Sequence, residues 1–228
     1  MMLYTEKDKR IVGLLSICSG VMALACLIVG LVATQYDADA FANPVKLLDM
    51  IAVDTNKIRW FMLLDLFGYY LLLLPVVFFV HSKLEHKTPW AAFFTSLGFS
   101  YILVGAIGAS VLSVLWPSAI DQHAVATESA QELYKSQFAF ATDFVVKGMW
   151  NYLEVLFAGA WWLGLGFFVV MSRSLKIVTI ILGTACIMDG LGEIMQIPVL
   201  AEVGLNIYLV LGIVWPIWAG RNIMKNKF

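Results

Sequence analysis

Hydrophobic and polar positions along this chain alternate in long blocks rather than residue by residue. Apolar runs of about 20 residues, the length a helix needs to cross a hydrocarbon core about 30 Å thick, are separated by short polar segments. The pattern therefore predicts about six transmembrane helices. They are expected at residues 11–34, 58–80, 90–115, 150–171, 176–197 and 204–221.

Two prolines interrupt this pattern. Pro75 removes one helical hydrogen bond in the second run and should kink it, and Pro216 should break the last and shortest run. The first run follows the charged segment EKDKR, in the charge order of a secretory signal. Because a signal has an apolar core of only about 7–15 residues, we expect this longer run to be a retained first helix.

Composition supports the same architecture. The chain has 228 residues, of which 61% are hydrophobic and 14% charged, with a mean hydropathy of +0.84. A soluble domain is usually about half apolar and about a quarter charged. No linker-like segment divides the chain, so residues 1–228 are expected to form one all-α, polytopic membrane bundle.

The distribution of basic residues predicts the orientation of the bundle. Ten of the 15 Lys and Arg residues fall at the termini and in the second and fourth loops, which lie on one side. The positive-inside rule therefore predicts that both termini are cytoplasmic. The ten residues are Lys7, Lys9, Arg10, Lys83, Lys87, Arg173, Lys176, Arg221, Lys225 and Lys227.

Two short amphipathic helices are expected in the outer loops. The segment NPVKLLDMIAV has Asn43 as a candidate N-cap and Pro44 at the first helical position. A second helix should begin near Ser129 and Glu132, which have capping-box spacing. Its apolar face covers residues 130–149 and runs into the fourth span. Either one long helix leaves the membrane here, or Gly148 breaks it.

Four acidic residues fall inside the predicted spans: Asp65, Glu154, Asp189 and Glu193. At helical rise, Asp65 lies about 10 Å, Asp189 about 12 Å and Glu193 about 6 Å below the outer membrane boundary. A carboxylate that faces lipid costs at least about 2.5 kcal/mol. We therefore expect all four to face the interior of the outer half of the bundle.

Helical spacing places polar residues in common stripes. Asp189, Glu193 and Gln196 share one face of the fifth span, and Asp65 shares a face with Tyr69. Such stripes predict a polar cavity open to the outside. The candidate site residues are Arg59, Asp65, Tyr69, Lys147, Asn151, Glu154, Asp189, Glu193 and Gln196.

Two explanations of the acidic residues stay open at this stage. In the first, they pair with Arg59 and Lys147 and hold the helices together. In the second, they line a functional cavity, as a charge within a membrane usually indicates. Four acids against two bases leave a surplus of negative charge that pairing alone does not explain, which favours the functional cavity.

Other kinds of site have little support in the sequence. The net charge of −1 offers no basic surface for nucleic acid. Three cysteines without CxxC spacing are expected as buried apolar thiols. His81 and His86, five residues apart, are poorly spaced as metal ligands on one helix face. We therefore expect neither a metal centre nor a cofactor.

Three segments resemble a known family. They are KRIVGLL, LGLGFFVVMSRSLK and VWPIWAGRNI, and they are similar to segments of small six-span bacterial membrane proteins known only as a domain of unknown function. This resemblance implies a protein of the bacterial inner membrane. It implies no catalytic residues.

Three functions are compatible with this architecture. The first is binding or transport of a small molecule or cation in the acid-lined cavity, and dimerisation would compensate for the small size of the bundle. The second is an enzyme on a lipid or isoprenoid, in which paired carboxyls act as acid and base without a cofactor. The third is a non-catalytic partner subunit or sensor. In each of these three functions, we expect the protein to be embedded in a lipid bilayer.

Overall fold

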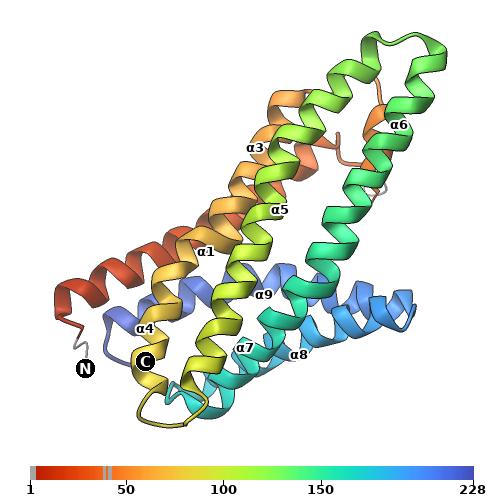
Figure 1. The fold of residues 1–228 in the computed structure, drawn as a ribbon. Coiled ribbons are helices and arrows are strands. Elements are labelled where there is room, and N and C mark those ends of the chain that lie inside the picture. The colour runs from red at the N-terminus through yellow and green to blue at the C-terminus, as the bar shows by residue number, and fades with distance from the viewer. Residues whose placement is uncertain (1–3, 38–39, 41–42) are drawn as a thin grey trace.

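The computed structural model describes residues 4–37, 40 and 43–228, and these residues form helices and loops without any strand (Figure 1). The elements are α1 (Glu6–Ala33), η1 (Pro44–Leu48), α3 (Thr55–Asp65), η2 (Leu66–Tyr70), η3 (Leu71–Leu73), α4 (Leu74–Leu84), α5 (Ala91–Val125), α6 (Glu128–Asp143), η4 (Phe144–Glu154), α7 (Val155–Phe168), α8 (Arg173–Ile194) and α9 (Pro198–Met224).

The all-α architecture is confirmed. Within the described ranges, five helices are long and apolar enough to cross a membrane: Glu6–Ala33, Thr55–Leu84, Ala91–Val125, Arg173–Ile194 and Pro198–Met224. They coincide with five of the predicted spans and indicate a membrane-embedded protein. The remaining predicted span covers part of η4 and α7, and α7 alone has only 14 residues. The count of six therefore stays a prediction.

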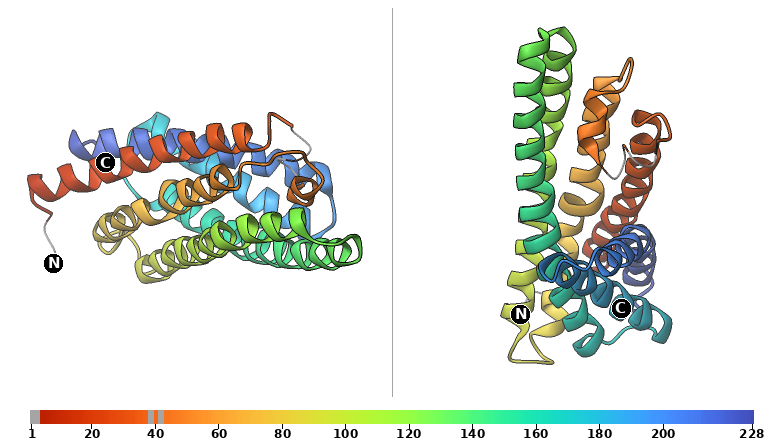
Figure 2. Two further views of the ribbon diagram at one scale, coloured as in Figure 1. Left: turned by 90° about the horizontal axis from the view of Figure 1, so that it is seen from above. Right: turned by 90° about the vertical axis from the view of Figure 1, so that its right-hand side faces the viewer.

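The long helices pack as a closed ring. Going around it, α1 contacts α9, α9 contacts α8, α8 contacts α7, α7 contacts α5, α5 contacts α3, and α3 returns to α1. Figure 2 shows that α8 and α9 run at a wide angle to α5 and α6. Small residues permit the closest approach, since a Cβ on Gly20 would lie 2.6 Å from the carbonyl oxygen of Ile213. The largest fully buried side chains include Trp161 and Trp162 of α7 and Trp215 of α9.

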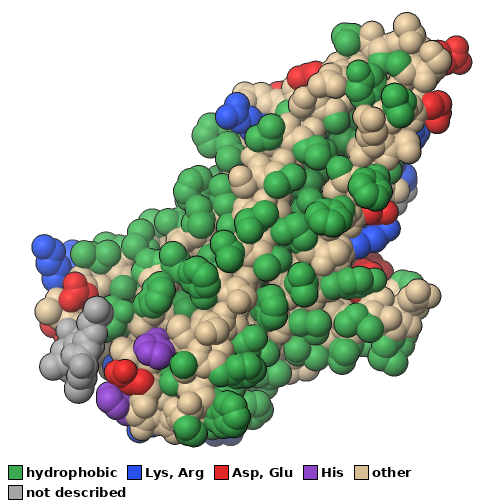
Figure 3. Space-filling view, viewed as in Figure 1, with side chains coloured by type: hydrophobic (Ala, Val, Ile, Leu, Met, Phe, Trp, Pro, Cys, Tyr) green, Lys and Arg blue, Asp and Glu red, His purple; other side chains and the backbone are tan. Residues whose placement is uncertain are grey.

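Both termini lie at the same end of the bundle (Figure 1). Lys9 donates a 2.7 Å hydrogen bond to Asn226, and Asn222 donates one of 3.3 Å to Ser172 in the α7–α8 loop. The ring of Phe228 packs against the ring of Phe79 in α4. The segments that carry the ten basic residues are thus gathered together, and Figure 3 shows Lys, Arg and His side chains at this end. The membrane side that this end faces stays a prediction.

At the opposite end, α5 and α6 form a hairpin that extends beyond the other helices (Figure 1). The 35 residues of α5 correspond to about 52 Å, well beyond a core about 30 Å thick. The pair between Lys135 of α6 and Asp49 at the end of η1, 2.9 Å apart, ties this hairpin to the α1–α3 connection. The third predicted span, 90–115, is thus the lower part of a longer helix.

The helix does not break at Gly148. The chain is helical from 128 to 168, through α6, η4 and α7, and its middle portion, η4, is a π-helix of 11 residues. The helix is therefore continuous, and that it leaves the membrane here stays a prediction. Nothing lies within 4 Å of a Cβ built on Gly148, so this glycine accommodates no neighbouring helix.

Several local predictions were wrong. The capping box at Ser129 does not form, because α6 begins at Glu128 with Thr127 in the N-cap position. The outer helix does begin with Asn43 at the N-cap position and Pro44 at the first helical position, but it is the five-residue 3-10 helix η1 and has no side-chain cap. Pro216 does not break α9, which is continuous and is held between α1 and α8.

Candidate functional site

The helix around Pro75 departs from α geometry in a way that exposes backbone carbonyls. Proline cannot donate a backbone hydrogen bond, and the turns before it are a π-helix, η2, followed by a 3-10 helix, η3. Neighbouring helices satisfy carbonyls in this irregular region. Ser19 donates to the carbonyl of Gly68, and Tyr101 donates to the carbonyl of Tyr69, both at 2.5 Å. The second predicted span is therefore distorted where a kink was expected.

A second irregular segment, η4, ends at Glu154. This side chain is 2% exposed, and its two oxygens accept hydrogen bonds from two tyrosines. Tyr70, at the end of η2, donates to Oε2 at 3.1 Å, and Tyr208 of α9 donates to Oε1 at 2.9 Å. Single-turn π segments within helices are frequent at functional sites. Here two π segments and α9 meet at one buried carboxyl group.

The approach of Tyr70 to this carboxyl depends on a glycine. A Cβ on Gly105 of α5 would overlap the ring of Tyr70. The carbonyl oxygen of Gly105 also accepts a 3.3 Å hydrogen bond from Trp150 of η4. Gly105 thus lets α5 and η4 close around the tyrosine ring.

Asp189 of α8 is fully buried, at 0% exposure, and neither carboxyl oxygen has a hydrogen-bond partner. Its backbone lies directly against α9, since a Cβ on Gly204 would be 2.5 Å from the Asp189 nitrogen. Asp65 is half-buried, and its Oδ2 is buried without a partner. Glu154 lies close enough to both aspartates for their charges to interact. Asp65, Tyr70, Glu154, Asp189 and Tyr208 are called the acid–tyrosine cluster below.

Glu193 and Asn151 lie between this cluster and the α8–α9 turn. Asn151 of η4 donates a 3.2 Å hydrogen bond to Oε1 of Glu193, and both side chains are half-buried. The charge of Glu193 also reaches Asp189. Gln196 does not join them, because α8 ends at Ile194 and Gln196 is exposed with a φ of 56°. The predicted stripe of the fifth span thus ends at Glu193.

The two predicted bases lie outside the cluster. Arg59 and Lys147 are both exposed, and Lys147 forms an ion pair with Asp143 at 3.0 Å. Among the described residues, no ion pair joins either base to any of the four acids. The pairing explanation therefore has no support from the geometry. Tyr69 also points elsewhere, because its hydroxyl donates to the carbonyl of Leu209.

An aromatic cluster packs directly against these residues. Its members are buried, with neighbouring ring centroids 5.2–6.1 Å apart. The indole nitrogen of Trp215 donates to Thr179 at 2.8 Å, whereas those of Trp161 and Trp162 have no partner. The aromatic cluster consists of Tyr101, Trp161, Trp162, Tyr208 and Trp215, so Tyr208 belongs to both clusters.

The acids are spaced as single carboxyl groups. Among the described residues, no group of three or more His, Cys, Asp or Glu side chains is placed to hold a metal ion. Each carboxyl of the acid–tyrosine cluster is therefore suited to bind a proton, or to contact a ligand, on its own.

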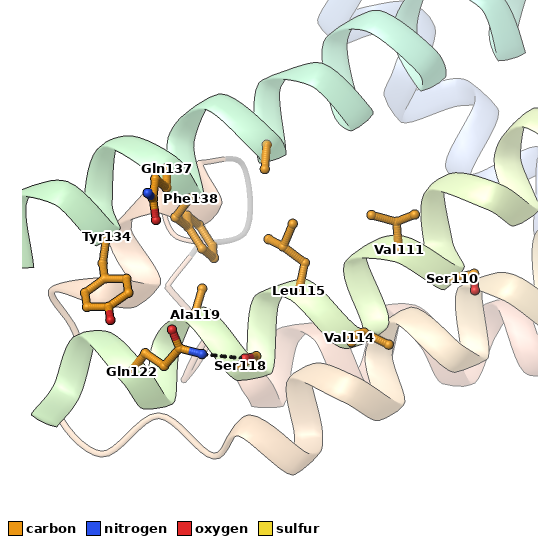
Figure 4. A pocket seen from close by; sticks show the side chains of 11 residues that line it. Ser110, Val111, Val114, Leu115, Ser118, Ala119, Gln122, Tyr134, Gln137 and Phe138 are labelled. Atoms are coloured by element: carbon orange, nitrogen blue, oxygen red, sulfur yellow. Dashed lines mark hydrogen bonds between the residues drawn. The ribbon is translucent and has the colours of Figure 1, made fainter. Parts of the chain in front are cut away.

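A groove of about 690 Å³ lies between α5 and α6, away from the acids (Figure 4). Its walls are mainly apolar at one end, near Val111, and carry the side chains of Gln122, Tyr134 and Gln137 at the other. The full lining is Ser110, Val111, Val114, Leu115, Ser118, Ala119, Gln122, Tyr134, Gln137, Phe138 and Ala141. None of the predicted site residues lines this groove.

Comparison of the chain with protein-family models, with curated proteins and with solved structures finds no match. The resemblance to a six-span bacterial family therefore stays a prediction. The functional argument depends on the geometry of the acid–tyrosine cluster itself.

Proposed function

We propose that this chain is a six-span protein of the bacterial inner membrane with both termini in the cytoplasm. In this proposal, the acid–tyrosine cluster binds protons, and proton binding is coupled to the binding or transport of a small solute or cation. The gathering of the basic segments at one end supports the orientation. The helical continuity through η4 and α7 supports the sixth span.

One observation carries the functional proposal: the side chains of Glu154 and Asp189 are buried, and among the described residues neither forms an ion pair with a basic side chain. Removing a carboxylate from water costs several kcal/mol when no counter-ion compensates it. Uptake of a proton, or the arrival of a cation, removes that cost. A buried cluster of this kind is therefore suited to bind and release a proton or a cation, because permanently ionised carboxylates would be costly there.

The two tyrosines give Glu154 a fixed geometry for this exchange. Their hydroxyls donate from two different segments of the bundle, Tyr70 from η2 and Tyr208 from α9. A hydroxyl can both donate and accept hydrogen bonds, and its hydrogen can rotate. Each tyrosine can therefore respond when the charge of Glu154 changes. Through such a response, proton or cation binding at Glu154 would affect both η2 and α9.

A flux measurement in membrane vesicles tests this function. Everted vesicles that contain the protein are energised to an acidic interior, and a pH-sensitive dye reports proton efflux on addition of sodium, potassium or tetramethylammonium. We expect the wild type to release protons with at least one of these probes, and the Glu154→Gln variant to release none.

The matched control is Glu132→Gln, an exposed glutamate on α6 that should leave efflux unchanged. Equal efflux from the wild type and Glu154→Gln with every probe would contradict the proposal. The lipid-enzyme and partner-subunit alternatives stay predictions. The α5–α6 groove gives the enzyme alternative little support, because no acidic residue lines it.

A further inference from the structure

Two stripes of polar side chains lead from one end of the bundle to the acid–tyrosine cluster. On α8, Glu193 is half-buried, and Asp189, one helical turn deeper, is fully buried. On η4, Asn151 is half-buried, and Glu154, one turn deeper, is fully buried. The hydrogen bond from Asn151 to Glu193 joins the two stripes at their outer ends. Exposure thus falls along both stripes in the same direction.

The outer end of these stripes lies next to an exposed turn. Helix α8 ends at Ile194, one residue after Glu193, and the turn that follows is exposed. Met195 is 61% exposed and Gln196 adopts a positive φ, as expected for a helix that stops at a surface. Glu193 therefore lies between this exposed turn and the unpaired carboxyl of Asp189.

The aromatic cluster closes the opposite direction. Trp161, Trp162 and Trp215 are at most 1% exposed and pack ring against ring. Among the described residues, Glu154 and Asp189 are the only buried acidic or basic side chains. Beyond the tryptophans, the hydroxyl of Thr179 donates to a backbone carbonyl within its own helix. No buried carboxyl there continues the stripes towards the termini.

We infer that protons enter and leave the acid–tyrosine cluster from the end of the bundle opposite to the termini, through Glu193 and Asp189, while the aromatic cluster seals the terminal end. The inference rests on the proposed function and specifies the side of access. In each step a proton leaves one carboxyl group and joins the next carboxylate, so Glu193 becomes ionised as Asp189 becomes neutral. Asp189 has both oxygens free to accept that proton.

Titratable side chains on α1, α3, η2, α5, α8 and α9 lie near this route, and three of them, Asp65, Tyr70 and Tyr208, belong to the acid–tyrosine cluster itself. Each could alter the charge of the cluster, but none forms a second stripe that reaches the surface. They are Cys26 on α1, Asp65, Tyr69 and Tyr70 on α3 and η2, Tyr101 on α5, Cys186 on α8 and Tyr208 on α9.

Separate pH jumps on the two sides of a membrane test the inference. The full chain is reconstituted into liposomes, its orientation is established with a C-terminal tag, and tryptophan fluorescence is followed after each jump. Trp162 contacts Tyr208, which binds Glu154, so the emission should report occupancy of the cluster. We expect a fast response to pH at the Glu193 side, and only slow leakage after a jump at the terminal side.

Variants of Glu193 test the route itself. Glu193→Gln should slow the fast response by about 100-fold, the lower range for loss of a positioned proton-transfer group. Glu193→Asp keeps a carboxyl group and should restore most of the rate, which distinguishes proton transfer from a packing role. Glu202→Gln, an exposed glutamate at the same end, is the matched control and should respond like the wild type.

Each outcome separates the inference from the proposed function. A fast response only from the terminal side would overturn the inference and leave proton binding intact. A fast response of folded Glu193→Gln at the wild-type rate would overturn the route through Glu193. No response of the wild type from either side would contradict the proposed function itself.

Discussion

Two helix contacts in this protein each contain a buried polar side chain, which is hydrogen-bonded in one contact and unpaired in the other. Where α1 meets α9, Ser16 donates a 2.7 Å hydrogen bond to the carbonyl of Pro216, so its hydroxyl is satisfied within the protein. Where α8 faces η4, both oxygens of the buried Asp189 have no partner. Buried polar groups are normally hydrogen-bonded, so an exception calls for an explanation. The first contact is structural, and the second holds a carboxyl group that, in our proposal, binds a proton or a cation.

The difference follows from the chemistry of the side chains. A serine hydroxyl carries no charge, and one hydrogen bond to a backbone carbonyl satisfies its single donor. A carboxylate offers acceptor sites that only donors, a proton or a cation can fill. In the η4–α8 contact the neighbours of Asp189 are other acids, Glu154 and Glu193. The contact therefore gathers acidic groups, and among the described residues no basic side chain forms an ion pair with any of them.

The largest expected effect comes from closing the gap that admits Tyr70. Gly105→Ala would place a methyl group against the Tyr70 ring, and overpacking of this kind costs about 1–3 kcal/mol. Gly148→Ala meets no neighbour, and replacing a helical glycine by alanine there should stabilise by about 0.5–1 kcal/mol. Thermal unfolding in detergent measures both variants. Equal stability of the two would show that the Tyr70–Glu154 contact does not depend on a close approach.

Smaller changes in stability, of opposite sign, are expected from substitutions in the α1–α9 contact and in the η4–α8 contact. Ser16→Ala removes a buried hydrogen bond and should cost about 1 kcal/mol, while proton-coupled flux stays normal. Asp189→Asn removes an unpaired buried charge, so stability should stay equal or rise while flux is lost. Denaturation in mild detergent and vesicle flux are measured on both variants. The comparison fails if Asp189→Asn is the less stable of the two.

The smallest effects belong to exposed pairs outside the spans. The hydrogen bond to Asp49 raises the pKa of Lys135, so its stabilisation is present at neutral pH and is lost as alkaline pH passes the raised value. The hydrogen bond from Lys57 lowers the pKa of Asp54, so that stabilisation is lost only as acidic pH passes the lowered value.

Melting temperatures of Lys135→Gln and Asp54→Asn across pH measure these contributions. Both differences from the wild type should be small and should shrink with added salt, since exposed pairs are screened. A large salt-independent loss at neutral pH would mean that these outer contacts, rather than the ring of helices, hold the fold together.

The helices were predictable because hydrophobicity acts over whole segments. Every predicted span falls mainly on helix, and Asp189 and Glu193 lie within reach of each other on α8 as their spacing implied. Local boundaries were less predictable, as at Gln196, which the end of α8 removes from its stripe. Packing against α1 and α8 keeps α9 helical through Pro216, and no pattern within α9 indicates this support.

The tyrosines of the site could not be found by helix arithmetic. A π-helix bonds residue i to residue i+5 and shifts the faces of all residues that follow it. Across η2, the α spacing from Asp65 indicated Tyr69, whereas Tyr70 is the residue that reaches Glu154. Pro75 signals that the helix is irregular, but it does not say by how many residues the face shifts.

Infrared difference spectroscopy of the purified protein tests the central claim most directly, because the carbonyl stretch of a protonated carboxyl group is separate from that of a carboxylate. Spectra are recorded between mildly acidic and mildly alkaline pH for the wild type, Glu154→Gln and Asp189→Asn, with Glu132→Gln as control. We expect a pH-dependent carboxylic-acid band in the wild type and the control that is reduced in both other variants. An unchanged band in Glu154→Gln and Asp189→Asn would show that the buried acids do not exchange protons and would contradict the account.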